Sequence, residues 1–201
     1  FVLMNFHPLI VTVMGGDILP ERGYHGIPAF FIRMLLENAD CITSKSDFMD
    51  AALNKIGNFR NKIRRITWGV NLDHFHPNRD VTSLRAQWHI PPDDLVFFDP
   101  RLARPLYNKH IIIEAFAKYM QEGGLSATLL IAESFPDPSY LAGLRQQAST
   151  LGITEKVRFV GAIPHGEMPD YYVLADLTIS VPFSDGLPQT IYEAYACGSF
   201  L

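Results

Sequence analysis

Hydrophobic residues occur along this chain in short continuous runs, and stretches of helical spacing separate these runs. A run rich in β-branched residues, such as LIVTVM at 9–14, is typical of a strand buried on both faces of a parallel sheet. Apolar residues three or four positions apart, as in residues 28–38, predict amphipathic helices. The expected strands are residues 9–14, 39–43, 63–67, 95–98, 127–132, 156–160 and 176–181, and the expected helices are residues 28–38, 46–56, 84–88, 111–120, 140–151, 168–174 and one that begins near Pro188.

This alternation of strand and helix occurs in both halves of the chain and predicts an α/β protein with two doubly wound parallel sheets. Three common α/β signatures are missing from the sequence. It has no Gly-x-Gly-x-x-Gly dinucleotide fingerprint, no phosphate-binding loop of the Gly-x4-Gly-Lys-[Ser/Thr] type and no Gly-x-Ser-x-Gly elbow. The pattern therefore argues against a dehydrogenase, a P-loop ATPase and an α/β hydrolase.

Short polar signals mark individual turns. Ser46 precedes a helical stretch and Gly57 follows it, as expected of an N-cap and a C-cap. Gly15-Gly16-Asp17 follows the first expected strand, where open α/β sheets bind ligands. It is either a tight turn that needs glycine or a loop that faces a ligand cleft.

Composition narrows the class of protein. The chain has 201 residues, 48% of them hydrophobic and 19% charged, as expected of a globular protein with a real core. Its net charge of −4 argues against a nucleic-acid-binding protein. Cys41 and Cys197 form no CxxC pair and are expected to be reduced, and neither a signal peptide nor a membrane-spanning run is visible. Because the chain begins with Phe1 and ends just after a helix, we expect a piece cut at both ends.

The stretch Ser184–Gly198, SDGLPQTIYEAYACG, follows the last expected strand and carries the clearest candidate chemistry. Pro188 suits the first turn of a helix, because its missing N–H is not needed there. The next three N–H groups, at residues 189–191, would be free to bind an anion. Asp185 before this helix and Glu193 within it place two carboxylates beside a phosphate-sized anion site.

This stretch resembles the E-x7-E region of retaining GT-B glycosyltransferases of family 4, also called glycosyltransferase group 1. The first acid is Asp185 rather than Glu, which shortens its reach by one methylene. The resemblance is strongest over residues 156–198, and residues 68–77 resemble the family's connection between two domains. It implies two Rossmann-like domains: residues 1–77, the end of an acceptor-side domain plus the linker, and residues 78–201, an incomplete nucleotide-sugar domain.

The resemblance also implies roles for individual residues. Arg101 and Lys109 would hold the diphosphate of a nucleotide sugar, and Arg is chemically suited to this contact. Asp185 and Glu193 would be the catalytic pair, with Glu193 on the ribose hydroxyls and Asp185 on those of the donor sugar. The remaining donor-binding residues would be Gly186, Leu187, Gln189 and Thr190. No Asp-x-Asp motif is present, so metal-independent transfer is expected, with no cofactor besides the donor.

The expected activity is transfer of a sugar, with retention of anomeric configuration, to a glycan or lipid-linked acceptor. The alternative is a non-catalytic module that binds a sugar nucleotide or a glycan on the same scaffold. A cytoplasmic location is expected, with peripheral contact to the inner face of the membrane as a further expectation. Neither His7 nor His25 matches the family's acceptor-side histidine, so we expect that residue upstream, and we expect this piece alone to catalyse poorly.

Two other groups of residues have competing interpretations. Arg60, Lys62, Arg64 and Arg65 form a basic cluster, which is either a solvated surface or a contact for anionic lipid headgroups. His74 and His76 are spaced like a metal pair, but no further Cys, Asp or Glu array completes a site. They are therefore interpreted as part of an interdomain linker anchored by Phe75.

Overall fold

The computed structural model describes residues 6–19 and 27–201. The chain divides into two compact units, which are considered separately. The N-terminal unit comprises Phe1–Gly69 together with Ser184–Pro188, and the C-terminal unit comprises Val70–Phe183 and Gln189–Leu201. The short segment Ser184–Pro188 therefore belongs to a different unit from the residues on either side of it.

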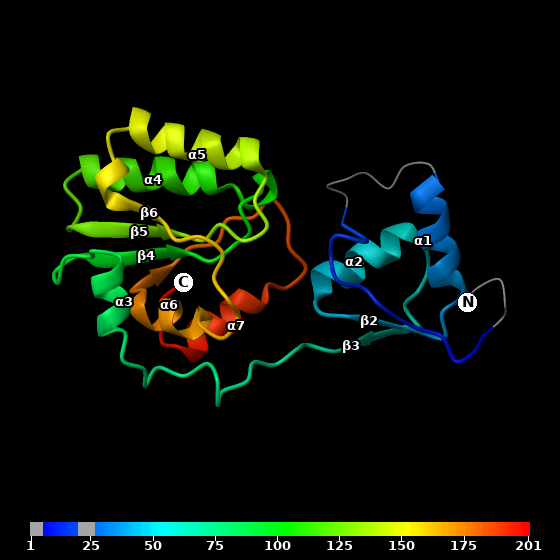
Figure 1. Ribbon diagram of the computed structural model, residues 1–201. Helices are drawn as coiled ribbons and strands as arrows, with labels where there is room; N and C mark the ends of the chain where they lie inside the picture. The colour runs from blue at the N-terminus through cyan, green and yellow to red at the C-terminus, as the bar shows by residue number, and fades with distance from the viewer. Residues whose placement is uncertain (1–5, 20–26) are drawn as a thin grey trace. The chain divides into compact units, whose positions relative to one another are not determined.

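The N-terminal unit contains a three-stranded parallel sheet of β1 (Ile10–Thr12), β2 (Cys41–Ser44) and β3 (Ile63–Arg65), in that order. Helices α1 (Ile27–Asn38) and α2 (Asp47–Ile56) are its crossover connections and lie on one side of it (Figure 1). Register places Ile42 opposite Val11 and Ile63. The buried core between sheet and helices is made by Val13, Ile18, Leu19, Leu36, Ala39, Ile42, Met49, Leu53 and Phe59.

Strand β1 differs from its expected environment. Val11 packs against the core, but Ile10 is 62% exposed and Met14 is 49% exposed. Successive side chains of a strand point to opposite faces, and α1 and α2 cover only the face that carries Val11. The prediction of burial on both faces is therefore wrong for β1 among the described residues, because an apolar run does not reveal which face is covered.

Helix α2 begins as the sequence predicts. Ser46 is its N-cap, and the Ser46 hydroxyl accepts a hydrogen bond from the Met49 N–H at 3.3 Å. Gly57 is the C-cap, and its N–H donates to the Leu53 carbonyl at 3.2 Å. Both capping predictions are confirmed, and the start of α2 is thereby fixed at the carboxyl end of β2.

The C-terminal unit contains four parallel strands in the order β6-β5-β4-β7. Their bounds are Leu95–Asp99 for β4, Ala127–Ile131 for β5, Val157–Phe159 for β6 and Leu177–Thr178 for β7. Every residue of β5 is buried, as expected of a central strand covered on both faces. The helices are α3 (Thr82–Gln87), α4 (Lys109–Gln121), α5 (Pro138–Thr150), α6 (Met168–Leu174) and α7 (Gln189–Ala196), with single 3-10 turns at Pro105–Tyr107 and Thr154–Lys156.

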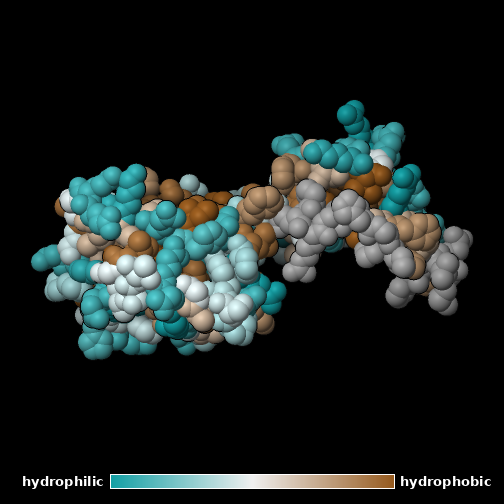
Figure 2. Space-filling view, turned by 90° about the horizontal axis from the view of Figure 1, so that it is seen from above, coloured by the Kyte–Doolittle hydropathy of each residue, from teal (hydrophilic) through white to brown (hydrophobic). Residues whose placement is uncertain are grey.

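Two separate cores cover the two faces of this sheet (Figure 1). On one face α4 and α5 pack against Leu129 and Ile131 of β5. On the other face α6 and α7 pack against Phe98 and Leu130, with α3 contributing at the edge. Figure 2 looks down on the α4–α5 side and shows mainly hydrophilic residues there, with scattered hydrophobic ones. A doubly wound sheet with polar outer helix faces is the expected α/β arrangement, which confirms the fold class.

The segment after Gly69 belongs to the C-terminal unit. Phe75 is buried in the core under α6, as predicted for an anchor of this stretch. A little further along, the Arg79 guanidinium forms an ion pair with Asp170 of α6 at 2.6 Å. Residues 70–79 are therefore fixed to the C-terminal unit by one apolar and one ionic contact.

Candidate functional site

The carboxyl end of β4 carries a fully buried ion pair. The Lys109 ammonium at the start of α4 lies 2.7 Å from the Asp99 carboxylate, and neither side chain is exposed. Burial raises the pKa of Asp99 and lowers the pKa of Lys109, and in each case the partner's charge opposes the effect of burial. A direct contact between Lys109 and a phosphate would require this pair to open, so that contact stays a prediction.

Arg101 lies two residues beyond β4 and is held through both its backbone and its side chain. Its backbone N–H donates to the Asp99 carboxylate at 3.0 Å, on the oxygen that Lys109 does not use. Its guanidinium donates to the Thr190 hydroxyl at 3.0 Å and lies over the ring of Tyr107, 4.5 Å from the ring centre. The structure thus brings together two predicted donor-binding residues, Arg101 and Thr190, which are 89 positions apart in the sequence.

Glu193 of α7 is almost completely buried, at 9% exposure. The hydroxyl of Tyr172, on α6, donates a hydrogen bond to its carboxylate at 3.0 Å. Burial, together with the charge of Glu193, holds the pKa of the Tyr172 hydroxyl far above its usual range. Tyr172 therefore stays a neutral donor and fixes the orientation of Glu193. Sequence reasoning missed this contact, because Tyr172 has the ordinary helical spacing of a core residue.

The start of α7 lies beside Arg101. Gln189 and Thr190 occupy the first turn of this helix, which contains no acidic residue. Positive potential at a helix N-terminus contributes roughly 0.3–1 kcal/mol to binding an exposed anion and about 2 kcal/mol in a buried site. A diphosphate at this position would therefore depend on the Arg101 guanidinium for much of its attraction, and this role of Arg101 stays a prediction.

The loop before α7 carries Asp185, Gly186 and Leu187 and is part of the N-terminal unit. The Gly186 carbonyl accepts a hydrogen bond from the Ser46 hydroxyl at 2.7 Å. A Cβ atom on Gly186 would lie 2.5 Å from the Met49 sulfur, so only glycine fits here without movement of its neighbour. Ser46 therefore has two contacts, one that caps α2 and one that fixes the backbone of the predicted donor loop.

The Gly15-Gly16-Asp17 segment folds back on itself. The Asp17 carboxylate accepts hydrogen bonds from the N–H of Gly15 at 2.7 Å and from that of Met14 at 3.0 Å. Gly15 has a φ of +121°, which only glycine adopts readily. These contacts agree with the first of the two interpretations of this segment, a tight turn that needs glycine.

The carboxyl end of β5 carries an unusual backbone at Phe135. This residue has a φ of +45° although it is not glycine, and its ring is 73% exposed. The Arg104 guanidinium donates to the Phe135 carbonyl at 3.0 Å. Glu133, two residues earlier, forms an ion pair with Arg145 of α5. Arg104 and Arg145 thus hold the loop that follows β5 through its Phe135 carbonyl and its Glu133 carboxylate.

Two of the histidines singled out in the sequence, His74 and His7, contact neighbouring side chains. The ring of His74 stacks on that of His165, with 5.4 Å between ring centres. His7 lies 2.6 Å from Asp40, and this hydrogen bond lowers the pKa of the Asp40 carboxyl. His25 lies outside the described residues. Across residues 6–19 and 27–201, no group of three or more His, Cys, Asp or Glu side chains is arranged to hold a metal ion.

The basic cluster near β3 is bonded within its own unit. Arg65 forms ion pairs with Asp47 and Asp50 of α2, which raise the pKa of its guanidinium. The Lys62 ammonium donates to the Glu37 carbonyl at 2.6 Å. None of the helices in the described part of the chain has the length and apolar character needed to cross a bilayer. Lipid contact by this cluster stays a prediction.

Comparison with known proteins places this chain in a family. The family described as "Glycosyl transferases group 1" matches residues 80–200, more than half of the chain. D-inositol 3-phosphate glycosyltransferase 2 of Catenulispora acidiphila is 28% identical over 171 residues, which cover 82% of this chain and 40% of that protein. D-inositol 3-phosphate glycosyltransferase of Streptomyces bingchenggensis is 27% identical over 136 residues, or 65% of this chain and 30% of that protein. The chain thus spans well under half the length of these relatives.

Solved structures agree on the fold. Anabaena HepE, solved in complex with UDP and glucose, superposes with a TM-score of 0.83 at 22% identity, over 96% of this chain and 51% of that chain. Sucrose-phosphate synthase from Thermosynechococcus elongatus gives a TM-score of 0.77 at 22% identity, over 96% and 49% of the two chains. These likenesses support the GT-B-type α/β fold predicted from the sequence. Together with the family match over the C-terminal unit, they show that the chain belongs to the group 1 glycosyl transferases.

Proposed function

We propose that this chain is part of a glycosyltransferase that moves a sugar from a nucleotide diphosphate sugar to a glycan or lipid-linked acceptor, with retention of configuration and without a metal ion. One observation carries the proposal: the Arg101 guanidinium bonds the Thr190 hydroxyl at the carboxyl edge of the C-terminal sheet, where open α/β sheets bind ligands, and Glu193 follows Thr190 by three positions on α7. Arg101 would bind the diphosphate, and Glu193 would bind the ribose hydroxyls.

Transfer of the sugar breaks its bond to the diphosphate, so negative charge grows on the leaving phosphate oxygen. Preorganised cations and N–H groups lower the barrier by stabilising that charge. Arg101 and the first turn of α7, with Gln189 and Thr190, would supply them. The Lys109–Asp99 pair would chiefly hold Arg101 in position. Asp99 accepts a hydrogen bond from the Arg101 backbone N–H, and Lys109 compensates the buried charge of Asp99.

The acidic loop would bind the donor sugar. Asp185 would accept hydrogen bonds from sugar hydroxyls, and the backbone of Gly186 and Leu187 would line the same region. Ser46 supports this role, because its hydroxyl holds the Gly186 carbonyl and thereby the direction of the neighbouring peptide groups. We further propose a cytoplasmic location with peripheral membrane contact for a lipid-linked acceptor.

The proposal is tested by thermal unfolding of the full-length protein with UDP, GDP, ADP and their sugars, with and without Mg²⁺. A UDP-sugar comes first, because HepE was solved with UDP and with UDP-glucose. Ligand at about 100 times its Kd adds about 2.7 kcal/mol to the free energy of unfolding. We expect one nucleotide to raise Tm without Mg²⁺, and Arg101→Ala or Glu193→Ala to abolish the shift.

A matched control is Lys118→Ala, which removes an exposed cation on α4 far along the helix from Lys109. It should leave the nucleotide shift unchanged. Turnover that is lost in Asp185→Ala would support the transferase, whereas tight binding without turnover would support a non-catalytic sugar-nucleotide module. If no nucleotide raises Tm, the proposed donor site is wrong.

A further inference from the structure

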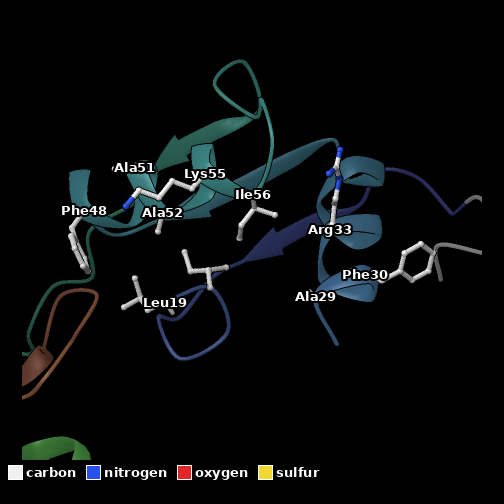
Figure 3. Close-up of a pocket in the computed structure, with 10 residues that line it drawn as sticks. Leu19, Ala29, Phe30, Arg33, Phe48, Ala51, Ala52, Lys55 and Ile56 are labelled. Atoms are coloured by element: carbon white, nitrogen blue, oxygen red, sulfur yellow. The ribbon is translucent and has the colours of Figure 1, made fainter. Parts of the chain in front are cut away.

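The N-terminal unit contains a pocket of about 550 Å³ that takes no part in the site above. It lies between α1, α2 and the turn after β1 (Figure 3). Its volume falls within the range of roughly 300–1,000 Å³ that is usual for small-molecule sites. All ten of its lining residues belong to the described part of the N-terminal unit: Ile18, Leu19, Ala29, Phe30, Arg33, Phe48, Ala51, Ala52, Lys55 and Ile56.

The lining changes character from floor to rim. Ile18 and Leu19 are buried and form an apolar floor. Ala52 and Ile56 of α2 are half-buried and form a wall. Figure 3 shows Ala52 and Ile56 of α2 on one side of the pocket and Leu19 on the other. A ligand that enters the pocket must therefore place hydrocarbon, and not polar groups, at its inner end.

The rim is aromatic and positively charged. Phe30 is 64% exposed and Phe48 is 56% exposed, and the lining contains Arg33 and Lys55 but no acidic residue. Figure 3 places the Lys55 ammonium on the Phe48 side and the Arg33 guanidinium on the α1 side. The pocket is thus apolar inside and cationic outside.

The two cations are not equivalent. The Arg33 guanidinium donates to the Glu37 carboxylate one helical turn away, at 2.8 Å, so an anion beside Arg33 would also lie near a negative charge. Lys55 has no ion pair or side-chain hydrogen bond with the described residues, 6–19 and 27–201. An anionic group on the ligand would therefore find its strongest attraction at Lys55.

We propose that this pocket binds a single-chain anionic amphiphile, a hydrocarbon chain that ends in a phosphate ester. The chain would lie on Ile18 and Leu19, and the phosphate would lie at the Lys55 rim. This site is distinct from the proposed donor site and needs none of its residues. Its occupant is a monomeric amphiphile and not a bilayer surface, because the apolar floor lies inside the pocket.

The test is calorimetric titration of the full-length protein with hexyl, octyl and decyl phosphate, each below its micelle concentration. Each added methylene should tighten binding about fourfold, since burying one CH₂ contributes about 0.8 kcal/mol. Inorganic phosphate should bind at least a hundredfold more weakly than decyl phosphate, and decyltrimethylammonium should not bind.

Two variants test the residues. Lys55 is at an exposed position of α2, so it can be replaced without disturbing the core. Lys55→Glu should weaken decyl phosphate binding on the order of tenfold or more, because a carboxylate there repels the phosphate that the ammonium attracts. Lys118→Glu, the matched charge reversal on α4, should have no effect. Ala52→Phe should fill the pocket and abolish binding, with Tm measured to show that the variant is folded.

Equal affinity along the chain-length series would overturn the proposal, as would unchanged binding by Lys55→Glu, or binding to anionic vesicles only. The nucleotide-induced Tm shift is measured on the same samples. If no amphiphile binds but a nucleotide still raises Tm, only the proposed pocket ligand is refuted. If an amphiphile binds but no nucleotide raises Tm, only the proposed donor site is refuted.

Discussion

The Tyr172 hydroxyl donates a hydrogen bond to the Glu193 carboxylate at 3.0 Å, and both side chains are buried. This bond joins α6 to α7 and holds the acid that we place on the donor ribose. Its strength should exceed that of a bond between neutral groups, because one partner is charged. The consequence can be measured on the protein without any ligand.

Tyr172→Phe should lower the free energy of unfolding by about 1.5–3 kcal/mol, the usual contribution of a hydrogen bond to a charged group. Urea denaturation measures the change. The neighbouring Tyr171→Phe is the control, because the Tyr171 hydroxyl accepts a hydrogen bond from a neutral group, the Trp88 indole N–H, at 3.1 Å. It should cost about 1 kcal/mol. Equal losses in the two variants would show that Glu193 is not held as a charged acceptor.

Lys109→Met should be strongly destabilising. It leaves the Asp99 carboxylate fully buried without its counter-charge, and removing one partner of a buried ion pair typically costs about 3–5 kcal/mol. The double variant Asp99→Asn/Lys109→Met should regain most of this loss, because Asn still accepts from the Arg101 N–H. A double-mutant cycle by urea denaturation measures the coupling. Additive losses would contradict the paired arrangement.

Protonation of Asp94 at acid pH should lower the free energy of unfolding. Burial raises the pKa of this carboxyl, but hydrogen bonds from Ser126, Lys156 and Thr128 outweigh burial and leave the pKa below its usual value. An acid with a lowered folded-state pKa adds stability above its unfolded pKa of about 3.9, and this stability is lost as pH falls through the lower folded value.

The Asp94→Asn variant should therefore be less stable than the parent above pH 5, by about 1.5–3 kcal/mol, and the difference should shrink below pH 4. Urea denaturation at several pH values measures it. Asp80→Asn is a control for an exposed acid whose pKa is lowered only by local bonds to Thr82. A difference in unfolding free energy between the parent and Asp94→Asn that stays constant down to pH 2 would contradict a lowered pKa of Asp94.

The two thiols should react at different rates. Cys197 is 3% exposed, and burial raises its pKa to about 11, so few thiolates form at neutral pH. Cys41 is half-buried, on the face of β2 opposite the buried Ile42. With a thiol reagent at pH 8, one equivalent should react quickly, and Cys41→Ser should remove that phase. Rapid reaction of Cys197 in the folded protein would contradict its burial.

The sequence predicted most of the helices and strands. The family resemblance assigned Arg101 and Thr190 to one donor site, and the structure places these two side chains 3.0 Å apart. The sequence did not reveal the Lys109–Asp99 pair, because two charged residues ten positions apart give no sign of complete burial. It also did not show that Ile10 is exposed, because apolar runs do not specify which face a neighbour covers.

The contacts of the predicted donor loop, residues 185–187, could not be predicted from the sequence either. Ser46 looked like a helix cap and is one, but its second bond, to the Gly186 carbonyl, joins residues 140 positions apart. Tyr172 was indistinguishable from its apolar neighbours until its hydroxyl was placed. Contacts of this kind depend on the final packing of the chain and not on any local pattern.

Phe135 has a consequence for laboratory evolution. Its left-handed backbone, with a φ of +45°, costs a non-glycine residue roughly 1–2 kcal/mol that glycine would not incur. A library screened for heat resistance alone should therefore enrich Phe135→Gly early. A library screened for both heat resistance and sugar transfer would show, by keeping or losing the phenyl ring, whether that ring serves the reaction.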